Sequence, residues 1–441
     1  MRTSTWSTCS PLSWQVCTWL PARRRGGRRR RKSVSRPLDS VTRSLGDVDA
    51  LARGARVVQP GDRPSVPRIR VLHVVLDLHA GGLERLVADL VRRVDPVRFD
   101  NHVLALRFLG RNARGLEQAG RLHVARPLPR WTMVWPLPLT RQIRAIAPDV
   151  VHTHSGVWYK ASLAARQAGV RRLIHTDHGR VDPDRWGGRL LDRLAARRTD
   201  VVVAVSEALA QQLAATGVAE ARRLRVVPNG VDTERFGPRP GGASVRRELA
   251  LDDVTPIIGS VGRFDAVKRY DLMIEAFACL RAAWRDGPAP VLVMMGEGPE
   301  GARLAALVET HHLQGAVRLF GWRDDVERLL TAFDVFTLAS RSEGTSVSLL
   351  EAMSAGICPV VTDVGGNRAV LGAELRHRLV PAGDARALAA AWEAALADGQ
   401  GRRVDGAAAR RRVEQRFSLD AMVRAYERLY VGEADTDSAT T

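Results

Sequence analysis

Two carboxylates next to a turn of small residues are the first candidates for chemistry. Glu343 and Glu351 lie eight residues apart in "SEGTSVSLLEAMSAG" (342–356). If a helix begins near Ser346, its first amides are unpaired donors, and they favour an anion by about 0.3–2 kcal/mol. The pattern predicts a phosphate site, with Glu343 facing the group attached to the phosphates and Glu351 accepting hydrogen bonds from ribose hydroxyls. The alternative is that both glutamates are solvent-exposed surface charges.

A basic motif, "GRFDAVK" (262–268), follows an apolar run and precedes a helical one. It places Gly262, Arg263 and Lys268 in the loop between a strand and a helix. A guanidinium and an ammonium at the carboxyl end of a parallel strand suit a diphosphate, and such a site needs no metal. Ordinary surface charges are the alternative interpretation.

Glycines mark two further strand ends. Gly81 and Gly82 open a helix after the first apolar run, so a ligand can approach the backbone there, although a purely structural turn explains them equally well. "GEGPEG" (296–301) has the G-x-G-x-x-G spacing of dinucleotide-binding proteins. The next strand closes on "LFGW" without the acidic residue which that fingerprint requires, so hydride chemistry is not expected.

Four histidines gather at neighbouring strand ends. His152 and His154 alternate in "VHTHS", and His175 and His178 end "IHTDHG". Together they could bind zinc, but we favour no metal because no carboxylate or cysteine partner is evident. We expect His178 to lie near the reaction centre, and His152 and His154 to pack into the floor of a cleft.

Strands and helices must alternate to position these residues. From Ile69 onwards, apolar runs of five to eight residues alternate with helical periods, and these runs are apolar on both faces, as in a covered parallel sheet. The length of 441 residues exceeds the roughly 250–300 that one core supports. We predict an α/β protein with two Rossmann-like, doubly wound domains facing across a cleft, at 69–235 and 236–418, a Pro/Gly-rich linker at 232–256, and a C-terminal helix at 419–431 that packs back on the first domain.

The composition narrows the class of protein. Hydrophobic residues make up 45% and charged residues 26%, and no run reaches the ~18 apolar residues of a membrane span. The net charge is +19, of which residues 1–68 carry +11 from 15 Arg or Lys and 4 Asp. We interpret 1–68 as a disordered basic extension or a misassigned start, with a nucleic-acid or anionic-membrane tail as the alternative. The four cysteines lack zinc spacing, which favours reduced thiols in a cytoplasmic protein.

Taken together, these motifs resemble the family-4 retaining glycosyltransferases of the GT-B fold. The match runs in order from about residue 69 to 430, through Gly81-Gly82, "HTDHG", "VSE", "VVPNGVD", "GRFDAVK", "GEGP" and "SEGTSVSLLEAMSAG". The resemblance implies transfer of a sugar from a nucleotide diphosphate donor, UDP- or GDP-linked, to a saccharide or lipid-linked acceptor, without a further cofactor. In its sequence motifs the chain most resembles the subgroup associated with bacterial exosortase and extracellular-polysaccharide systems.

The resemblance also implies roles for single residues. Arg263 and Lys268 would neutralise the leaving diphosphate, Glu343 would contact the donor sugar with His178 near it, and the loop containing Trp322 would pack on the base. Retention is described in this family as a same-face displacement in which the departing phosphate takes the acceptor's proton, so the protein acts by position and electrostatics. The donor-binding residues expected are Gly82, Gly262, Arg263, Lys268, Trp322, Arg323, Gly344, Thr345, Ser346 and Glu351; Gly81, His152 and His154 are expected on the acceptor side.

The chain departs from the family's usual sequence next to the expected reaction site. Thr345 and Ser346 stand where a Phe-Gly pair is frequent, which leaves donor-sugar specificity open. The basic, Trp-bearing stretch 128–144 could contact anionic lipid at the inner face of the plasma membrane, or could be a surface loop and a solvated helix face. Nucleic acid is not an expected partner. A nucleotide-sugar 2-epimerase and a non-catalytic nucleotide-sugar-binding protein are the competing functions.

Overall fold

The structure is a computed structural model. It describes residues 67–78, 81–113, 116, 121–125, 135–179 and 186–433. The predictions for the basic N-terminal extension therefore concern residues that lie almost entirely outside the described part. None of the helices in these ranges combines the length and apolar composition of a membrane span.

The first half is built on a parallel sheet with the strand order β3-β2-β1-β4-β5-β6-β7. The central strands are buried over nearly their whole length, which accounts for their apolar and β-branched residues. The strands are β1 (Ile69–Val75), β2 (Phe99–Ala105), β3 (Leu122–Val124), β4 (Val150–His154), β5 (Arg172–Asp177), β6 (Val201–Ala204) and β7 (Leu224–Val226).

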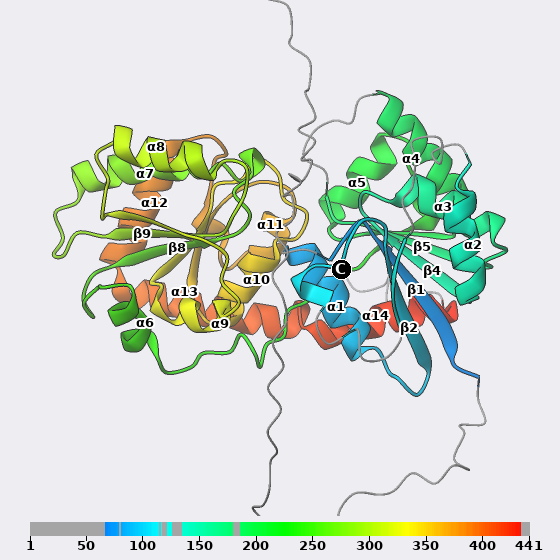
Figure 1. The fold of residues 1–441 in the computed structure, drawn as a ribbon. Coiled ribbons are helices and arrows are strands. Elements are labelled where there is room, and N and C mark those ends of the chain that lie inside the picture. The colour runs from blue at the N-terminus through cyan, green and yellow to red at the C-terminus, as the bar shows by residue number, and fades with distance from the viewer. Residues whose placement is uncertain are drawn as a thin grey trace, which may run out of the picture. The chain divides into compact units, whose positions relative to one another are not determined.

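Helices cover both faces of this sheet (Figure 1). One face packs against α1 (Gly82–Arg93) and the C-terminal helix α14 (Leu419–Val431). The other face packs against α2 (Leu137–Ile146), α3 (Trp158–Gln167), α4 (Trp186–Arg198) and α5 (Glu207–Ala215). In α2, Leu139 and Ile143 are buried, so this part of the Trp-bearing stretch is a helix packed on the core.

The second half repeats the plan with a parallel sheet in the order β10-β9-β8-β11-β12-β13. Its strands are β8 (Ile257–Val261), β9 (Val291–Met295), β10 (Val317–Phe320), β11 (Val335–Leu338), β12 (Cys358–Thr362) and β13 (Leu379–Val380). One face packs against α7 (Tyr270–Ala283), α8 (Gly301–Thr310) and α12 (Ala385–Ala397). The other packs against α6 (Gly242–Glu248), α9 (Val326–Leu329), α10 (Val347–Ser354), α11 (Asn367–Leu371) and α13 (Gly399–Arg416).

The stretch interpreted as a linker contains one of these helices. In α6, Val245 is buried, and Leu249 directly after the helix joins the same core. Two apolar residues four positions apart suffice to hold a short helix against a sheet, even within a Gly-rich, charged sequence. The linker prediction was therefore wrong for the part of the stretch that forms α6.

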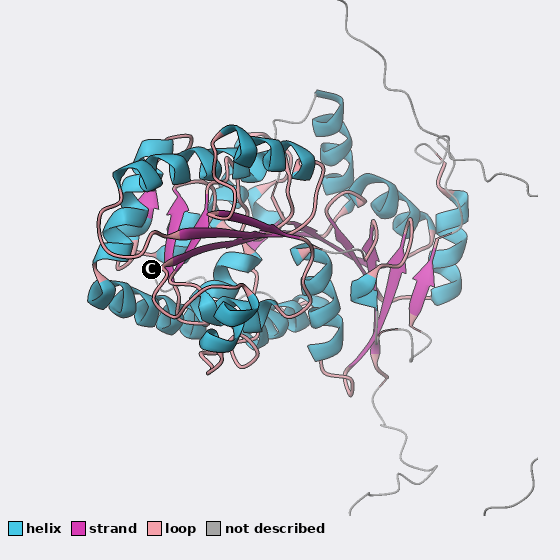
Figure 2. Cartoon of the chain, turned by 60° about the vertical axis from the view of Figure 1, so that its left-hand side comes forward, coloured by secondary structure: helices cyan, strands magenta, loops and turns pink. Residues whose placement is uncertain are grey.

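Figure 2 shows the strands of both halves enclosed by helices. This arrangement confirms the predicted α/β class with two Rossmann-like parallel sheets. In each sheet the strand order reverses beside the first strand, between β1 and β4 and between β8 and β11. Loops leave such a point in opposite directions and open a crevice at the carboxyl ends of the strands. The motifs singled out above lie in the strands, in the loops at their carboxyl ends, or, like Glu351 in α10, in the helices that follow.

Candidate active site

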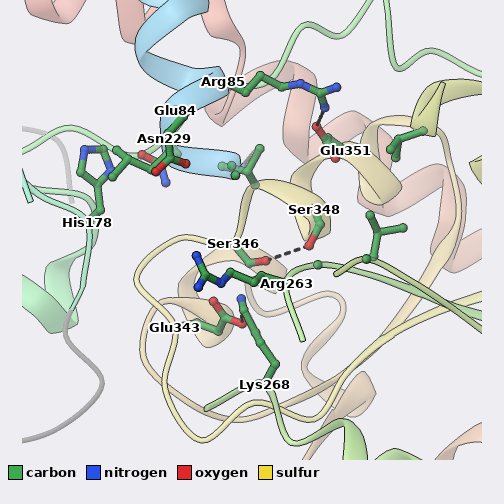
Figure 3. Close-up of a pocket in the computed structure, with 18 of the residues that line it drawn as sticks. Glu84, Arg85, His178, Asn229, Arg263, Lys268, Glu343, Ser346, Ser348 and Glu351 are labelled. Atoms are coloured by element: carbon green, nitrogen blue, oxygen red, sulfur yellow. Dashed lines mark hydrogen bonds and ion pairs between the residues drawn. The ribbon is translucent and has the colours of Figure 1, made fainter. Parts of the chain in front are cut away.

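A cavity of about 340 Å³ lies between loops of the two halves (Figure 3). The first half contributes the start of α1 and the loops after β5 and β7, and the second contributes the loops after β8, β9, β10 and β11. The structure brings together all ten residues predicted for donor binding, together with Gly81, His178 and Glu343. Residues up to 270 positions apart in sequence thus line one cavity.

The N-terminus of α10 opens onto this cavity. Its N-cap, Ser346, has an extended backbone and makes no side-chain hydrogen bond to the first amides of the helix. Its hydroxyl lies instead 3.3 Å from the hydroxyl of Ser348. The start of α1 faces it, since a Cβ on Gly82 would lie 3.4 Å from the Cβ of Val347. Two helix N-termini therefore add positive potential to the same space.

The cations of the cavity are paired with carboxylates. Lys268 ends a short 3-10 turn, and its Nζ donates to Oε1 of Glu343 at 2.7 Å. The hydroxyl of Ser340 donates to the same oxygen at 2.6 Å. The Arg263 side chain, 63% exposed, pairs with Asp265 at 3.0 Å. A phosphate that enters here can take over these cations. Glu343, with a side chain only 7% exposed, then keeps the Ser340 hydroxyl as a donor.

Glu351 is buried one turn into α10, and its partner comes from the other half. The Arg85 guanidinium donates to Oε1 of Glu351 at 2.7 Å and lies 5.8 Å from the centre of the Phe236 ring. Burial raises the pKa of Glu351, and the charge of Arg85 opposes this shift. The sequence reasoning did not select Arg85. Its position could have indicated it. Arg85 lies three residues after Gly82, one turn into α1, just as Glu351 lies one turn into α10.

Asn229 and Thr345 join the two halves beside the cavity. The Thr345 hydroxyl donates to the carbonyl of Val205, and the Asn229 amide donates to the carbonyl of Thr345 at 2.7 Å. Thr345 was expected among the donor-binding residues, and its side chain is committed to a contact between the halves. The Asn229 Oδ1 is buried and has no hydrogen-bond partner among the described residues. Asn229 belongs to "VVPNGVD" but was not singled out.

Two glycines allow the backbones to approach one another here. A Cβ on Gly344 would lie 2.4 Å from the carbonyl oxygen of His178, so only glycine fits between the loops after β5 and β11. Gly296 has φ +154°, and a Cβ there would lie 1.9 Å from the carbonyl oxygen of Gly262. The G-x-G-x-x-G spacing therefore reflects close packing of two loops at the cavity wall.

The loop after β10 forms another part of the wall. The guanidinium of Arg323 is held by Asp325 and Glu248, each at 2.9 Å, and the hydrogen bond with Asp325 is the main reason that its pKa is raised. The Trp322 indole donates to Asp324 at 2.8 Å. Arg323 thus lines the cavity with its charge already satisfied by protein carboxylates.

A second cavity of about 750 Å³ adjoins the first at the strand ends of the first half. The two share Leu83, Glu84, Arg263 and Trp322. His154 lines the second cavity. Glu84 reaches both cavities and was not selected from the sequence.

The predicted histidines separate in the structure. His178 lines the first cavity, while His152 is 0% exposed and reaches neither of the two. His152 bonds to the hydroxyls of Thr176 at 2.7 Å and of Tyr430 at 2.9 Å. His152, expected on the acceptor side and in the floor of the cleft, is thus buried behind the lining of both cavities.

Two family models match the chain. One, described as "Glycosyl transferases group 1", matches residues 243–412, and the other, described as "Glycosyltransferase Family 4", matches residues 80–235. Together they cover both halves around the cavity.

Individual proteins are similar over most of the chain. The 2-deoxystreptamine N-acetyl-D-glucosaminyltransferase of Streptomyces fradiae is 28% identical over 399 residues, which cover 81% of this chain and 93% of the relative. The UDP-Gal:alpha-D-GlcNAc-diphosphoundecaprenol alpha-1,3-galactosyltransferase of Escherichia coli is 29% identical over 245 residues, 54% of this chain and 63% of the relative. Among solved structures, Anabaena HepE in complex with UDP and glucose superposes with a TM-score of 0.71 at 20% identity, over 82% of this chain and 98% of HepE.

Proposed function

Because this chain belongs to glycosyltransferase family 4, whose members have the GT-B fold and transfer sugars from nucleotide donors, we propose that its donor is a UDP-sugar bound in the 340 Å³ cavity. The observation that supports this most is the meeting of Arg263, Lys268, the uncapped start of α10 and Glu351 in one place. The diphosphate would lie against the two cations and the helix amides, and the ribose hydroxyls would donate to Glu351. HepE, which shares the fold, binds UDP.

The proposed chemistry retains the configuration at the anomeric carbon. The bond from this carbon to the phosphate oxygen breaks, the acceptor oxygen bonds on the same face, and its proton passes to the departing phosphate. Arg263 and Lys268 stabilise the charge that develops on the diphosphate, so the site requires no metal ion. Glu343 and His178 contact the donor sugar, and Trp322 packs near the base. The protein then acts mainly by positioning and by fixed charges.

The acceptor is proposed to enter the 750 Å³ cavity beside the donor. Its lining includes Asp77 and Glu84, which can accept hydrogen bonds from sugar hydroxyls, and the aromatic rings of Phe108 and Trp322. A saccharide or a lipid-linked saccharide fits this lining, and the E. coli relative is named for a diphosphoundecaprenol acceptor. With such an acceptor the enzyme works in the cytoplasm at the inner face of the membrane. Trp135, 56% exposed at the start of α2, is then a candidate for contact with lipid.

The proposal is tested by incubating the full chain with UDP-, GDP- and ADP-sugars, with and without a lipid extract or a saccharide acceptor. We expect UDP release that depends on the acceptor, and a glycoside product whose anomeric configuration, measured by NMR, equals that of the donor. Release of nucleotide without an acceptor would indicate hydrolysis or a 2-epimerase. Binding of UDP without any turnover would indicate a nucleotide-sugar-binding protein. Either result would contradict the proposal.

A further inference from the structure

Behind His178 lies a group of buried imidazoles that the proposed reaction does not use. His73 in β1 and His154 in β4 are almost fully buried, and their rings stack at 5.7 Å between centroids with planes 12° apart. Asn101 in β2 lies at the far end, 3% exposed. Polar groups that are buried so deeply are retained only if they are hydrogen-bonded.

Three contacts connect these residues in series to the cavity. Nε2 of His178 lies 3.4 Å from Nδ1 of His154, and Nε2 of His154 lies 3.4 Å from Nδ1 of His73. Nε2 of His73 lies 3.4 Å from Oδ1 of Asn101. The series therefore runs through three neighbouring strands and ends at the loop after β5.

The series allows only one arrangement of protons once its far end is fixed. A neutral imidazole has one N–H and one lone pair, so rings linked in series must all donate in the same direction. Oδ1 of Asn101 only accepts, so His73 donates to it, His154 donates to His73, and His178 donates to His154. Burial lowers the pKa of His73 and of His178 to about 4, which keeps these rings neutral at pH 7.

We propose that Asn101, His73 and His154 are positioning residues that fix His178 as the Nε2–H tautomer, so that its Nδ1 accepts a hydrogen bond from a hydroxyl of the sugar substrate. Nδ1 of His178 has no hydrogen-bond partner among the described residues. The sugar contact rests on the proposed function, whereas the tautomer follows from the chain of contacts alone. In the other tautomer the ring would present an N–H donor where the substrate needs an acceptor, and a ring turned over would present a C–H there.

A metal site explains the same residues less well. Ligand atoms of His73, His152 and His154 lie within 4.8 Å of one another. Each ring nitrogen of these three already has a hydrogen-bond partner: the series occupies those of His73 and His154, and Thr176 and Tyr430 occupy those of His152. The arrangement is therefore that of a closed hydrogen-bonded network.

The tautomer is measured on the full chain without substrate. Protein labelled with ¹⁵N-histidine is examined by long-range ¹H–¹⁵N correlation at pH 7, with the His178 signals assigned from the His178→Gln variant. We expect His178 to be protonated at Nε2 and unprotonated at Nδ1. In His154→Phe this preference should be lost, and kcat should fall by about 10- to 100-fold with KM for the nucleotide-sugar within about twofold, as for a misplaced catalytic contact.

Matched variants separate the proposed role from damage to the core. His154→Asn keeps one donor and one acceptor and should restore much of kcat. His175→Phe makes the same change in β5, at a buried ring that stacks on Trp158 at 3.9 Å outside the series, and should leave tautomer and kcat unchanged. If His154→Phe does not fold, Asn101→Leu should scramble the tautomer, and Asn101→Asp, which keeps the acceptor, should preserve it.

Three results would overturn the proposal: an Nδ1–H tautomer of His178 in the unaltered chain, a tautomer and kcat that do not respond to His154→Phe and Asn101→Leu, or stoichiometric zinc whose removal abolishes binding. A chain that shows the expected tautomer but transfers no sugar would contradict the proposed function and leave the hydrogen-bonded series intact.

Discussion

At the scale of single residues, the cavity neutralises its own charges before a substrate arrives. Lys268 is bound to Glu343, Arg85 to Glu351 and Arg263 to Asp265. In the proposed function, a diphosphate would therefore exchange partners with these cations and would not meet bare charges. The more buried a cation is, the more its transfer to a diphosphate depends on whether its former carboxylate partner finds another hydrogen-bond donor. Arg263 is the most exposed of the three cations, so it can turn to a ligand at the lowest cost.

The first prediction concerns Arg263. Replacing it with alanine should lower kcat by about 10²–10³-fold, the usual loss when one preorganised donor to a developing charge is removed. Initial rates with a UDP-sugar and acceptor measure this change. Arg303→Ala removes an exposed arginine of α8 that pairs with Glu300, outside both cavities, and should leave kcat unchanged. Equal losses in the two variants would show that Arg263 acts through net charge alone.

Residues that stand at a fixed spacing from a strand end or a helix start could be predicted from the sequence. Arg263, Lys268, Glu343 and Ser346 sit at fixed offsets from a strand end or a helix start, and all of them line the cavity. Arg85 could not be found in this way, because its partner Glu351 is 266 residues away. His73, Asn101 and Asn229 likewise gain their importance from contacts with distant strands and loops.

At the scale of secondary structure elements, α1 and α10 meet end to end and share an ion pair. The second prediction is that Arg85→Ala weakens UDP binding by about tenfold or more, because Glu351 then lacks its counter-charge, and a buried carboxylate without one takes up a proton. Titration calorimetry with UDP at several pH values measures the loss. Arg92→Ala, an exposed arginine of the same helix that pairs with Asp89, should bind UDP normally. A normal affinity of Arg85→Ala for UDP would contradict the proposal that Glu351 binds the ribose.

The buried histidines in and beside the first sheet should make the fold sensitive to acid. An imidazole of the unfolded chain titrates near 6.5, whereas burial lowers the pKa of His73 and His178 to about 4 and holds the pKa values of His152 and His154 well below 6.5. Between these values the unfolded state binds protons that the folded state excludes. The free energy of unfolding should therefore fall as pH drops from about 6.5 to 4, by on the order of 3 kcal/mol for each of His73 and His178.

Urea unfolding measured at intervals between pH 7.5 and 4.5 tests this third prediction. The variant His73→Gln replaces one titrating ring by a neutral amide, and its stability should vary less steeply with pH than that of the unaltered chain. A stability that stays constant across the interval would mean that these histidines are accessible to protons in the folded state.

Element types were predictable where burial leaves a clear signature. Strands apolar on both faces and the long helices α12 and α14 follow from periodicity. α6 was missed because its seven residues include a glycine and several charges, and only Val245 is buried within the helix. Its stability comes from the second core, which a local sequence window does not reveal.

At the scale of the whole molecule, the chain crosses between its halves twice, and the crossings are joined. The amide of Val231 donates to the carbonyl of Phe417 and the amide of Leu419 donates to the carbonyl of Val231, both at 2.9 Å. A Cβ on Gly230 would lie 2.7 Å from the Cα of Leu419, so the outgoing and returning segments touch. The sequence analysis expected the C-terminal helix to pack back on the first domain, but it did not predict this pairing.

The last prediction follows from what α14 supplies to the first half. Five of its side chains, Met422, Val423, Tyr426, Leu429 and Tyr430, are buried in the core beneath the first sheet. Burying each contributes about 1.5–3 kcal/mol, so together they contribute roughly as much as the 5–15 kcal/mol net stability of a domain.

A chain that ends at Ser418 should therefore lose the cooperative thermal unfolding of the first half and become aggregation-prone. A chain that ends at Glu433 keeps all of α14 and should unfold like the full chain, so calorimetry of the two separates the loss of the helix from the loss of the residues after it. A fully folded, UDP-binding chain without α14 would mean that the second half holds the site alone, contrary to the ion pair between Arg85 and Glu351.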